Sequence, residues 1–295
     1  MSNYYKYLPL SQQDEDWGLH VLNTGHNQVM SRQEYPSPAH PGHHYFTWKK
    51  GRILQEFQVV YITRGNGYFE SAHCPLKKIQ AGTIFILFPG EWHRFKPDSS
   101  TGWDEHWVGF EGSILKKIFA KKFFEISTPI FHIGLHEKIL GLFNDIIKAS
   151  ETEKAGYQPY ISGAVLHLLG QLYMLMKQQS IPQDDQTEAI ITKAKILLRK
   201  GIDCKLSIGE VANELQVSYS WFRKTFKTYT GIAPGQYLQQ LRIEQAKFFL
   251  LDRSRTVKSI AYDLNFTSAF HFSALFKAKT SLSPAQYQKK FAGRK

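Results

Sequence analysis

The stretch SIGEVANELQVSYSWFRKTFK, residues 207–227, sets the fold of the C-terminal part of the chain. Ser207 and Glu210 have the spacing of a capping box, which predicts that a helix begins at Ser207. Apolar residues follow at helical spacing, namely Ile208, Val211, Ala212 and Leu215. Residues 216–218 then predict a tight turn, because Ser218 is a suitable N-cap for another helix. The stretch therefore predicts a helix, a turn and a second helix.

The second helix of this motif has an inward and an outward face. Phe222 and Phe226 are expected to anchor the helix in a core. The residues that we assign to the DNA-binding face are Tyr219, Ser220, Trp221, Arg223, Lys224 and Lys227. Hydrogen-bond donors and cations of this kind suit base edges and phosphates.

The same pattern occurs a second time further along the chain. Ala212 recurs as Ala261, 49 residues later, and Phe226 recurs as Phe276, 50 residues later, so the second turn, at residues 265–267, contains one extra residue. The expected DNA-binding residues of this second motif are Ser268, Phe270, His271, Ala274 and Lys277. Two copies indicate a duplicated module and not a solenoid.

The net charge of +12 belongs entirely to the C-terminal part. Residues 188–295 contain 19 Lys and Arg against 7 Asp and Glu, whereas residues 1–187 contain 18 of each kind. A charge excess confined to one region indicates a polyanionic partner. A membrane surface and a merely solvated basic face are the alternatives. The repeat, the capping pattern and the local charge together favour double-stranded DNA.

The first half of the chain has the pattern of short strands. The runs QVVYIT (residues 58–63) and TIFILF (residues 83–88) are β-branched and aromatic, and RGNG (residues 64–67) between them is a turn signal. Trp103, Glu105 and Trp107 share one face of a further strand, opposite Asp104, His106, Val108 and Phe110. Short strands with Gly and Pro turns predict a β-barrel or jelly roll.

From about Leu135 the apolar spacing becomes helical, and we expect helices over residues 135–178. The polar, proline-containing run QQSIPQDDQ (residues 178–186) has the composition of a linker. The chain is therefore predicted to be an α+β multidomain protein. Its parts are a β-rich domain over residues 1–178, a linker over 179–187 and an all-α domain over 188–295.

Composition also bears on location and cofactors. Cys74 and Cys204 lie in different halves and are expected to be free thiols in a reducing compartment. No apolar stretch is long enough to span a bilayer, and the first residues lack the apolar core of a signal peptide. We therefore expect a cytoplasmic protein without membrane attachment.

A metal site is one expectation for a β-barrel domain, and the positions of the histidines bear on it. The adjacent pair His43 and His44 would point to opposite faces of a strand, and the region of His93 supplies one histidine alone. We expect no metal and no cofactor, and we expect His40, His43 and His44 to be surface loop residues.

Residues 206–291 resemble the AraC/XylS type of transcription regulator. The residues that carry the resemblance are Ala212, Ser218, Phe226, Lys227, Thr230, Gly231, Pro234, Tyr237, Leu241, Arg242, Ala246, Ile260, Ala261, Tyr262, Phe266, Phe272, Phe276, Lys277, Pro284 and Tyr287. The resemblance implies a linking helix near residues 235–251 that holds the two motifs rigidly. It also implies that their second helices enter successive major grooves, about 34 Å apart on one face of the DNA.

The chain departs from the family pattern in the second motif. Asn265 replaces the turn glycine, which is tolerable because Asn accepts a positive φ, and Ser281 replaces the glycine after Thr280. Ala274 stands where family members often carry Arg or another polar residue, and Phe270 is also apolar. We infer that the second motif reads thymine methyl groups, or DNA shape, more than guanine.

A further set of residues lies in the first half of the chain, namely Arg52, YITRGNG (residues 61–67), Ala81, Gly82, FPGEWH (residues 88–93), Trp107 and Phe110. With this set, residues 40–110 resemble the cupin-type sensor domain of the same family. Carried over by position, the candidate effector-binding residues are Arg52, His93, Phe95, Glu105 and Trp107. A Trp face can stack on a sugar ring while Arg and Glu hydrogen-bond its hydroxyls. The alternative is that Trp103 and Trp107 are simply core residues. The helices over residues 135–178 match the region where relatives dimerise, so we expect a homodimer.

Three functional hypotheses follow. The first is a regulator that responds to a sugar-like small molecule and activates genes for carbohydrate uptake or breakdown, with RNA polymerase as a further candidate partner. The second is a cupin enzyme, an isomerase or dioxygenase, with a fused nucleic-acid-binding domain, and the missing metal ligands argue against it. The third is a ligand-independent stress regulator of the same family. We expect a regulator and not an enzyme.

Overall fold

The computed structural model describes residues 3–36, 46–180 and 184–292. The chain divides into two compact units, Met1–Ser180 and Ile181–Lys295. His40, His43 and His44, expected in a surface loop, lie outside the described residues. Each unit has its own hydrophobic core, and each is described here by itself.

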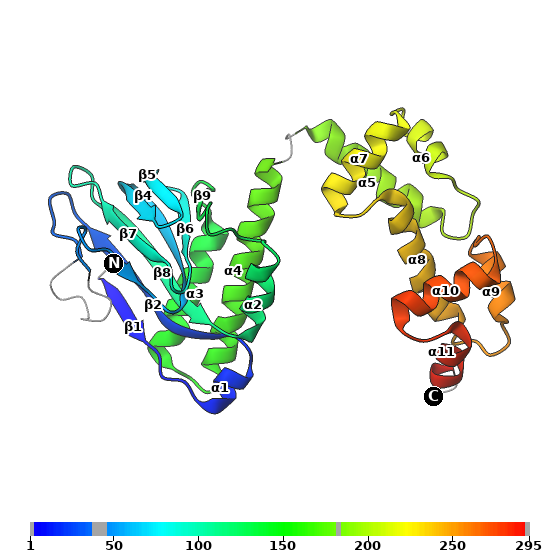
Figure 1. Ribbon diagram of the computed structural model, residues 1–295, viewed down its shortest axis with the longest axis horizontal. Coiled ribbons are helices and arrows are strands. Elements are labelled where there is room, and N and C mark those ends of the chain that lie inside the picture. The colour runs from blue at the N-terminus through cyan, green and yellow to red at the C-terminus, as the bar shows by residue number, and fades with distance from the viewer. Residues whose placement is uncertain (1–2, 37–45, 181–183, 293–295) are drawn as a thin grey trace. The chain divides into compact units, whose positions relative to one another are not determined.

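The N-terminal unit is built on strands that share one long member (Figure 1). These strands are β1 (Tyr4–Tyr7), β2 (His20–Val29), β3 (Arg52–Ile53), β4 (Phe57–Ser71), β5 (Cys74–Gln80), β6 (Thr83–Leu87), β7 (Trp92–Pro97), β8 (Trp103–Glu111) and β9 (Ile130–His132). The N-terminal half of β4 pairs with β6 and β8, and its C-terminal half pairs with β5 and β7. Strand β4 therefore belongs to two layers, one in the order β1-β2-β8-β4-β6-β9 and one in which β7 joins β3 to β4.

Two expectations about these strands need correction. Residues 64–67 do not form a turn: β4 continues through them, with a register shift between Ile62 and Arg64 and a positive φ of 79° at Gly65. The glycine-rich segment is instead where the strand bends from one layer into the other. The sheet also does not close into a barrel. Among the described strands the path starts at β1 and ends at β9, and no pairing joins those two edges.

Helices cover the outer face of the layer that contains β8 (Figure 1). The helices of this unit are α1 (Gln12–Asp16), α2 (Ser113–Ala120), α3 (Glu137–Thr152) and α4 (Tyr157–Ser180). The side chains of Val108 and Phe110 pack against this helical layer, whereas Trp103 lies in a second core between the two strand layers. The alternation predicted for residues 103–110 is thus confirmed, and it directs Glu105 and Trp107 away from the helices.

The C-terminal unit is entirely helical in its described part. Its helices are α5 (Asp185–Lys200), α6 (Ile208–Glu214), α7 (Tyr219–Thr230), α8 (Pro234–Phe249), α9 (Val257–Asp263), α10 (Ala269–Thr280) and α11 (Pro284–Phe291). Helices α6 and α7 form the first predicted helix-turn-helix motif, α9 and α10 form the second, and α8 is the linking helix between them (Figure 1).

Helices occupy part of the linker predicted over residues 179–187. Helix α4 continues through Ser180, and α5 already begins at Asp185. Asp184 starts α5 as its N-cap, because its side chain accepts a hydrogen bond from the backbone N–H of Gln186. A polar composition is compatible with both structures, since an Asp residue that suits a linker also suits the first turn of a helix.

Candidate DNA-binding face and effector pocket

The first motif forms as its capping residues predict. The backbone N–H of Glu210 donates to Ser207 Oγ at 3.1 Å, and the Ser207 N–H donates to the Glu210 carboxylate at 2.7 Å. The turn that follows contains Gln216 at a positive φ of 56°, and Ser218 then caps α7 by accepting from the N–H of Trp221. These caps fix where α7 begins and hence which of its residues face outward.

Helix α7 buries Phe222 and Phe226 and presents a polar, cationic surface. The exposed candidates on it are Tyr219, Ser220, Arg223, Lys224 and Lys227. The Arg223 guanidinium lies 5.6 Å from the centre of the Tyr219 ring. Trp221 differs from this group, because it is partly buried against the core of the first motif. The exposed side chains lie free to reach a ligand, whereas Trp221 is engaged mainly in packing.

Helix α10 presents a different surface in the second motif. Ser268 caps the helix by accepting from the N–H of His271, which engages its side chain locally. Phe270 is 85% exposed, and the other outward residues are His271, Ala274 and Lys277. Asn265, in the preceding turn, has the positive φ (51°) that its identity permits. All five residues predicted for this motif are therefore exposed, and two of them are apolar.

The N-terminal unit contains a hollow that opens to solvent. Four of the five predicted effector-binding residues line it, namely Arg52, Phe95, Glu105 and Trp107. The hollow lies between the two strand layers, since its walls come from β1, β2, β3, β4, β7 and β8. A hollow with aromatic walls and few charged groups has the lining of a small-molecule site.

His93 does not line the hollow and lies behind Arg52. It is 1% exposed, and its Nε2 accepts a hydrogen bond from Arg52 Nε at 3.2 Å. Its Nδ1 lies 3.0 Å from the carbonyl oxygen of Glu91, to which it donates when Nε2 is the acceptor. Burial, and after it the charge of Arg52, lower the pKa of His93 to about 3, so the ring is neutral. The prediction of His93 as a pocket residue is therefore wrong: it holds Arg52 in place.

Arg52 is packed among rings at the wall of the pocket. Its guanidinium lies 4.8 Å from the centre of Phe46 and 5.3 Å from the centre of Phe95. It also donates to Gln58 Oε1 at 3.4 Å, and Gln58 in turn donates to Asn23. Rings on one side and amides on the other fix the planar group, so that it meets a ligand with little loss of side-chain freedom.

Glu105 is the buried carboxyl of the pocket. It is 5% exposed and accepts hydrogen bonds from Asn27 Nδ2 and Tyr35 Oη, each at 3.1 Å. Burial raises the pKa of the Glu105 carboxyl to about 7, although these two hydrogen bonds and the charge of Arg52 act in the opposite direction. Glu105 can therefore change its protonation state near neutral pH, and it has room for further donors.

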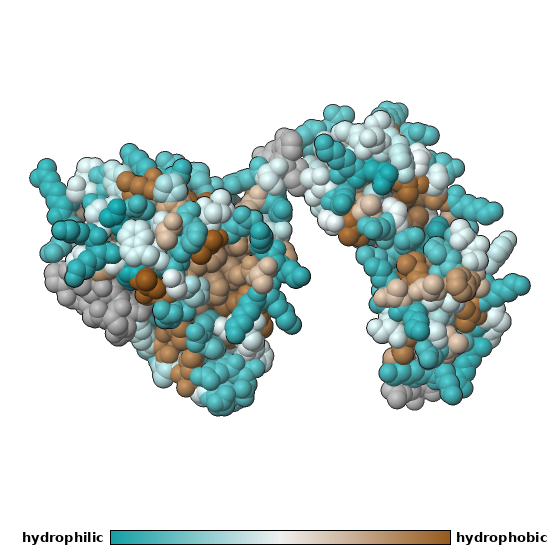
Figure 2. Space-filling view, in the orientation of Figure 1, coloured by the Kyte–Doolittle hydropathy of each residue, from teal (hydrophilic) through white to brown (hydrophobic). Residues whose placement is uncertain are grey.

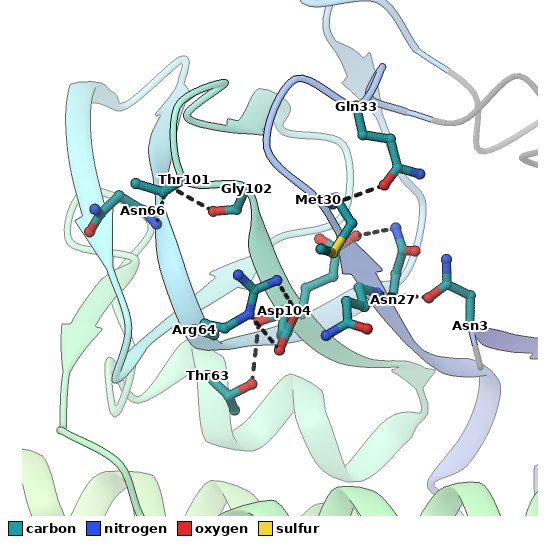
Figure 3. A network of polar contacts seen from close by, with 12 residues as sticks. Asn3, Asn27, Met30, Gln33, Thr63, Arg64, Asn66, Thr101, Gly102 and Asp104 are labelled. Atoms are coloured by element: carbon teal, nitrogen blue, oxygen red, sulfur yellow. Dashed lines mark hydrogen bonds and ion pairs between the residues drawn. The ribbon is translucent and has the colours of Figure 1, made fainter. Parts of the chain in front are cut away.

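The preceding residue, Asp104, points to the other face and anchors the strand (Figure 3). Arg64 Nε and Nη2 donate to the two carboxylate oxygens of Asp104, at 3.0 and 2.8 Å. This bidentate pair joins β4 to β8 beside the bend in β4. Because Glu105 is the neighbour of Asp104 in the strand, the pair also fixes the place where Glu105 enters the pocket.

The two tryptophans of β8 have different roles. Trp103 is fully buried and contacts the rings of Tyr35 and Phe95, so for this residue the core interpretation is correct. Trp107 is half-buried and lines the pocket. Its indole lies directly over Gly25 on the neighbouring strand, where a Cβ atom would approach the ring to 2.5 Å. Gly25 thus allows the Trp107 ring to lie flat along the pocket wall.

Sequence reasoning missed much of the pocket wall. The missed lining residues are Tyr5, Lys6, Tyr7, Asn23, Thr24, Tyr35, Phe46, Gln58 and Val60. Three of these come from β1, whose register against β2 places Tyr5 opposite Gly25. The alternation of β4 was a usable signal for Gln58 and Val60, which share a face, but it did not reveal that β1 covers the same hollow.

The structure also bears on metals and membranes. Within residues 3–36, 46–180 and 184–292 there is no group of three or more His, Cys, Asp or Glu side chains arranged to hold a metal ion. None of the helices in those ranges combines the length and the apolar character that a membrane crossing requires. Cys74 is buried, Cys204 is exposed, and both are free thiols.

A pair of capped helix-turn-helix motifs on one linking helix, carried with a β-rich unit that holds a pocket, defines a DNA-binding transcription regulator. Residues 34–193 match the family described as AraC-like ligand binding domain, and residues 211–290 match a helix-turn-helix domain. Because the first match covers more than half of the chain, the chain belongs to the AraC family of transcription regulators.

Curated relatives of similar length are also regulators. The raffinose operon transcriptional regulatory protein RafR of Pediococcus pentosaceus is 26% identical over 259 residues, which is 83% of this chain and 88% of that protein. The Msm operon regulatory protein of Streptococcus mutans is 23% identical over 245 residues, 80% of this chain and 85% of that protein. These relatives are transcription regulators and not enzymes.

Solved structures are also similar to part of this chain. An AraC-type DNA-binding domain protein from Chromobacterium violaceum is 25% identical, covers 38% of this chain and 100% of that one, and has a TM-score of 0.34. The DNA-binding domain of AdpA, solved in complex with a target DNA, is 23% identical, covers 34% and 91% of the two chains, and has a TM-score of 0.33.

Proposed function

We propose that this regulator senses a sugar-like molecule in the pocket of its N-terminal unit and activates genes for carbohydrate uptake or breakdown. The observation that carries the proposal is the arrangement of Trp107 beside Glu105 and Arg52 in one pocket. The names of relatives support the proposal, since one is the regulator of a raffinose operon and another, RhaR of Salmonella heidelberg, is a transcriptional activator.

The chemistry of the wall suits a polyhydroxylated ring. The exposed part of the Trp107 face can stack on the C–H side of a sugar, while Glu105 accepts from ring hydroxyls and Arg52 donates to them. Tyr5, Tyr7 and Tyr35 add hydroxyl groups, and Asn23 and Gln58 add amides. An aromatic plate with a rim of donors and acceptors discriminates hydroxyl positions better than an apolar pocket does.

In this proposal the C-terminal unit reads double-stranded promoter DNA through its two exposed helices. The contact residues are Tyr219, Ser220, Trp221, Arg223, Lys224 and Lys227 on α7, with Trp221 at the edge of the face, and Ser268, Phe270, His271, Ala274 and Lys277 on α10. The exposure of the α7 cations and the local charge excess support the assignment.

We further propose that the protein acts as a homodimer in the cytoplasm, with RNA polymerase as a partner at promoters. Residues 1–178 would serve as effector domain, with dimerisation helices over 135–178, and residues 188–295 as DNA-binding domain. Support for the dimer comes from apolar residues that gather over helices α2, α3 and α4 in Figure 2, and from the exposure of Leu135, Tyr160 and Met174.

The proposal is tested by thermal stabilisation of the full-length protein against a panel of sugars. A ligand at 100 times its Kd stabilises a protein by about 2.7 kcal/mol, which is easily measured. For the sugar that stabilises the wild type, we expect Trp107→Ala to abolish the shift while DNA binding without ligand persists. A Trp107→Ala protein that still responds removes Trp107 from the site, and a panel without any hit contradicts the sugar assignment.

Glu105 gives the second test, because its pKa near 7 predicts a pH dependence. The unfolded carboxyl loses its proton near 4.5, and the folded one keeps it until about 7. The folded state therefore binds more protons between these values, so the stability of the wild type falls as pH rises from about 4.5 to about 7. Sugar hydroxyls donate best to the ionised form, so effector affinity should rise with pH through about 7.

The variant Glu105→Gln keeps the volume and removes the charge. We expect it to lose both pH dependences and to bind the sugar more weakly than the wild type above pH 7. Calorimetric titration at pH 6 and pH 8 measures the affinity, and thermal unfolding at the same pH values measures the stability. Equal affinity of wild type and Glu105→Gln at both pH values would show that the carboxyl does not contact the effector.

A further inference from the structure

We propose that Arg242, in the linking helix, fixes the two helix-turn-helix motifs relative to each other and so determines which half-site spacing the protein accepts. The inference rests on the proposed placement of α7 and α10 against DNA. The preference for one half-site spacing would not come from a base contact of Arg242, because Arg242 itself would touch no DNA.

Helix α8 is shared by two separate cores. Leu238 belongs to the core of the first motif, together with Phe222 and Phe226, whereas Ile243 and Ala246 belong to the core of the second. Arg242 therefore lies on the helix at the point where one core ends and the other begins. Each motif is held to its own end of α8 by apolar packing, which is non-directional and by itself resists small tilts weakly.

The guanidinium of Arg242 spans that boundary. Nε donates to the carbonyl of Ile202 at 3.0 Å, and Nη2 donates to those of Gly201 and Cys204 at 3.4 and 3.1 Å. Nη1 donates to the carbonyl of Asn265 at 3.2 Å. The first three carbonyls follow the end of α5 and lead into the first motif, and the fourth lies in the turn of the second motif.

The acceptors have a common character. Gly201 caps the C-terminal end of α5, and Asn265 follows the C-terminal end of α9, so both lie where helix dipoles place partial negative charge. A planar group with five donors in fixed directions can satisfy both ends at once. A lysine ammonium on a flexible stem cannot, although it keeps the positive charge. The arrangement therefore requires an arginine in particular.

An apolar contact supports the same junction. Ile202 packs against the core of the first motif and also against the core of the second. Its backbone carbonyl is one of the acceptors of Arg242. The segment between α5 and α6 is therefore clamped at the junction by its side chain and by its backbone, and Arg242 connects this segment directly to the turn that precedes α10.

The test compares DNA duplexes that differ in spacing alone. A DNA site is first selected from a random pool by the full-length wild type. Three duplexes are then prepared, namely the selected site itself, the same site with one base pair inserted between its halves, and a single half-site. One base pair moves the second half-site by about 3.4 Å and rotates it by roughly a tenth of a turn. We expect the wild type to lose about tenfold or more in affinity on the inserted duplex.

The variant is Arg242→Lys in the full-length protein. It should lose affinity for the selected site by about tenfold while its affinity for the single half-site is unchanged, and its preference for the selected spacing over the inserted one should shrink towards one. The matched control is Arg253→Lys. Arg253 also donates to a backbone carbonyl, that of Ala292 at 2.8 and 3.2 Å, but both lie on the side of the second motif. This control should keep the wild-type spacing preference.

Each outcome bears on one of the two proposals. A folded Arg242→Lys protein that keeps the full spacing preference overturns the role of Arg242, and so does a wild type that tolerates the inserted base pair. Loss of half-site binding in Arg242→Lys also overturns it, since the effect would then be damage to a single motif. If the wild type selects no site at all, the failure lies instead with the proposed DNA-binding faces.

Discussion

Helices α7 and α10 occupy equivalent places in the two helix-turn-helix motifs, and a comparison of them separates what folding requires from what recognition requires. Their inward sides agree closely. The ring centres of Phe222 and Phe226 lie 5.6 Å apart, as do those of Phe272 and Phe276. The contact with the next helix is also the same, because the ring centres of Phe226 and Phe276 each lie 5.4 Å from that of a tyrosine in the next helix.

The ends of the two helices agree as well, even where the residues differ. Thr230 and Thr280 both return a hydroxyl hydrogen bond to the carbonyl four residues earlier, at 2.7 and 2.8 Å. The next residue is left-handed in both copies, although it is Gly231 in one and Ser281 in the other. The second motif thus accepts some backbone strain to keep the same helix end.

The outward sides differ in chemistry. Positions 50 residues apart carry Arg223 and Ser273, and Lys224 and Ala274, so two exposed cations of the first motif have no counterpart in the second. Conversely, Ser220 corresponds to the exposed Phe270. Packing therefore restricts the interior of both copies to one solution, whereas the surface has been free to diverge. We interpret the divergence as a division between charged and apolar reading of DNA.

The largest expected effect tests the equivalence of the interiors. Phe222→Ala and Phe272→Ala each remove a fully buried ring, and we expect each to lower the stability of the C-terminal unit by about 3–5 kcal/mol. Urea unfolding followed by circular dichroism measures both costs. A large difference between the two variants would break the comparison, since it would show that one motif supports the fold and the other does not.

Much of this arrangement is predictable from sequence because it is local. The capping box of Ser207 and Glu210 needs only residues three apart, and Asn265 tolerates its positive φ by its own chemistry. The alternation of residues 103–110 likewise depends on one strand. Each of these features was predicted correctly, since the interactions that create it lie within a few residues along the chain.

The features that sequence reasoning missed depend on partners far away along the chain. The glycine-rich residues 64–67 bend a strand instead of turning it, because β5 and β7 take over the pairing there. The wall of the pocket includes Tyr5 and Tyr7, which arrive through β1, and His93 is displaced from the pocket by Arg52. No local pattern records which distant strand covers a hollow.

A smaller effect is expected from the cations that distinguish α7. Arg223→Ala and Lys224→Ala should each weaken specific binding, by about 1–3 kcal/mol where the residue contacts a base. A residue that contacts only phosphate should weaken all sequences alike and reduce the slope of log affinity against log salt by about one unit. Fluorescence anisotropy at several salt concentrations distinguishes the two cases.

The matched positions in the second motif provide the control for these cations. Ser273→Ala should leave affinity and salt slope near the wild-type values, because no charge is removed. Introducing a cation by Ala274→Lys should increase affinity for all sequences and steepen the salt dependence, if α10 approaches the phosphates as α7 does. Unchanged binding in both Arg223→Ala and Lys224→Ala would instead indicate that the face of α7 is merely solvated.

The smallest effect concerns the apolar surface of α10. Phe270 and Ala274 have no hydrogen-bonding side-chain groups, so their base readout should depend on apolar contact, for which the C5-methyl group of thymine is the partner in the major groove.

Replacing thymine by deoxyuridine removes that methyl group and leaves the base pair intact. In the half-site opposite α10 we expect a loss of about 0.8 kcal/mol for each contacted methyl. The same replacement opposite α7 should cost less, because that helix offers donors and cations. Phe270→Ala should discriminate less between the two duplexes, so wild type and variant form a cycle whose coupling energy measures the contribution of the Phe270 ring. A wild type that binds both duplexes equally, while still preferring A·T pairs in that half-site, would show that α10 reads the shape of the groove and not the methyl groups.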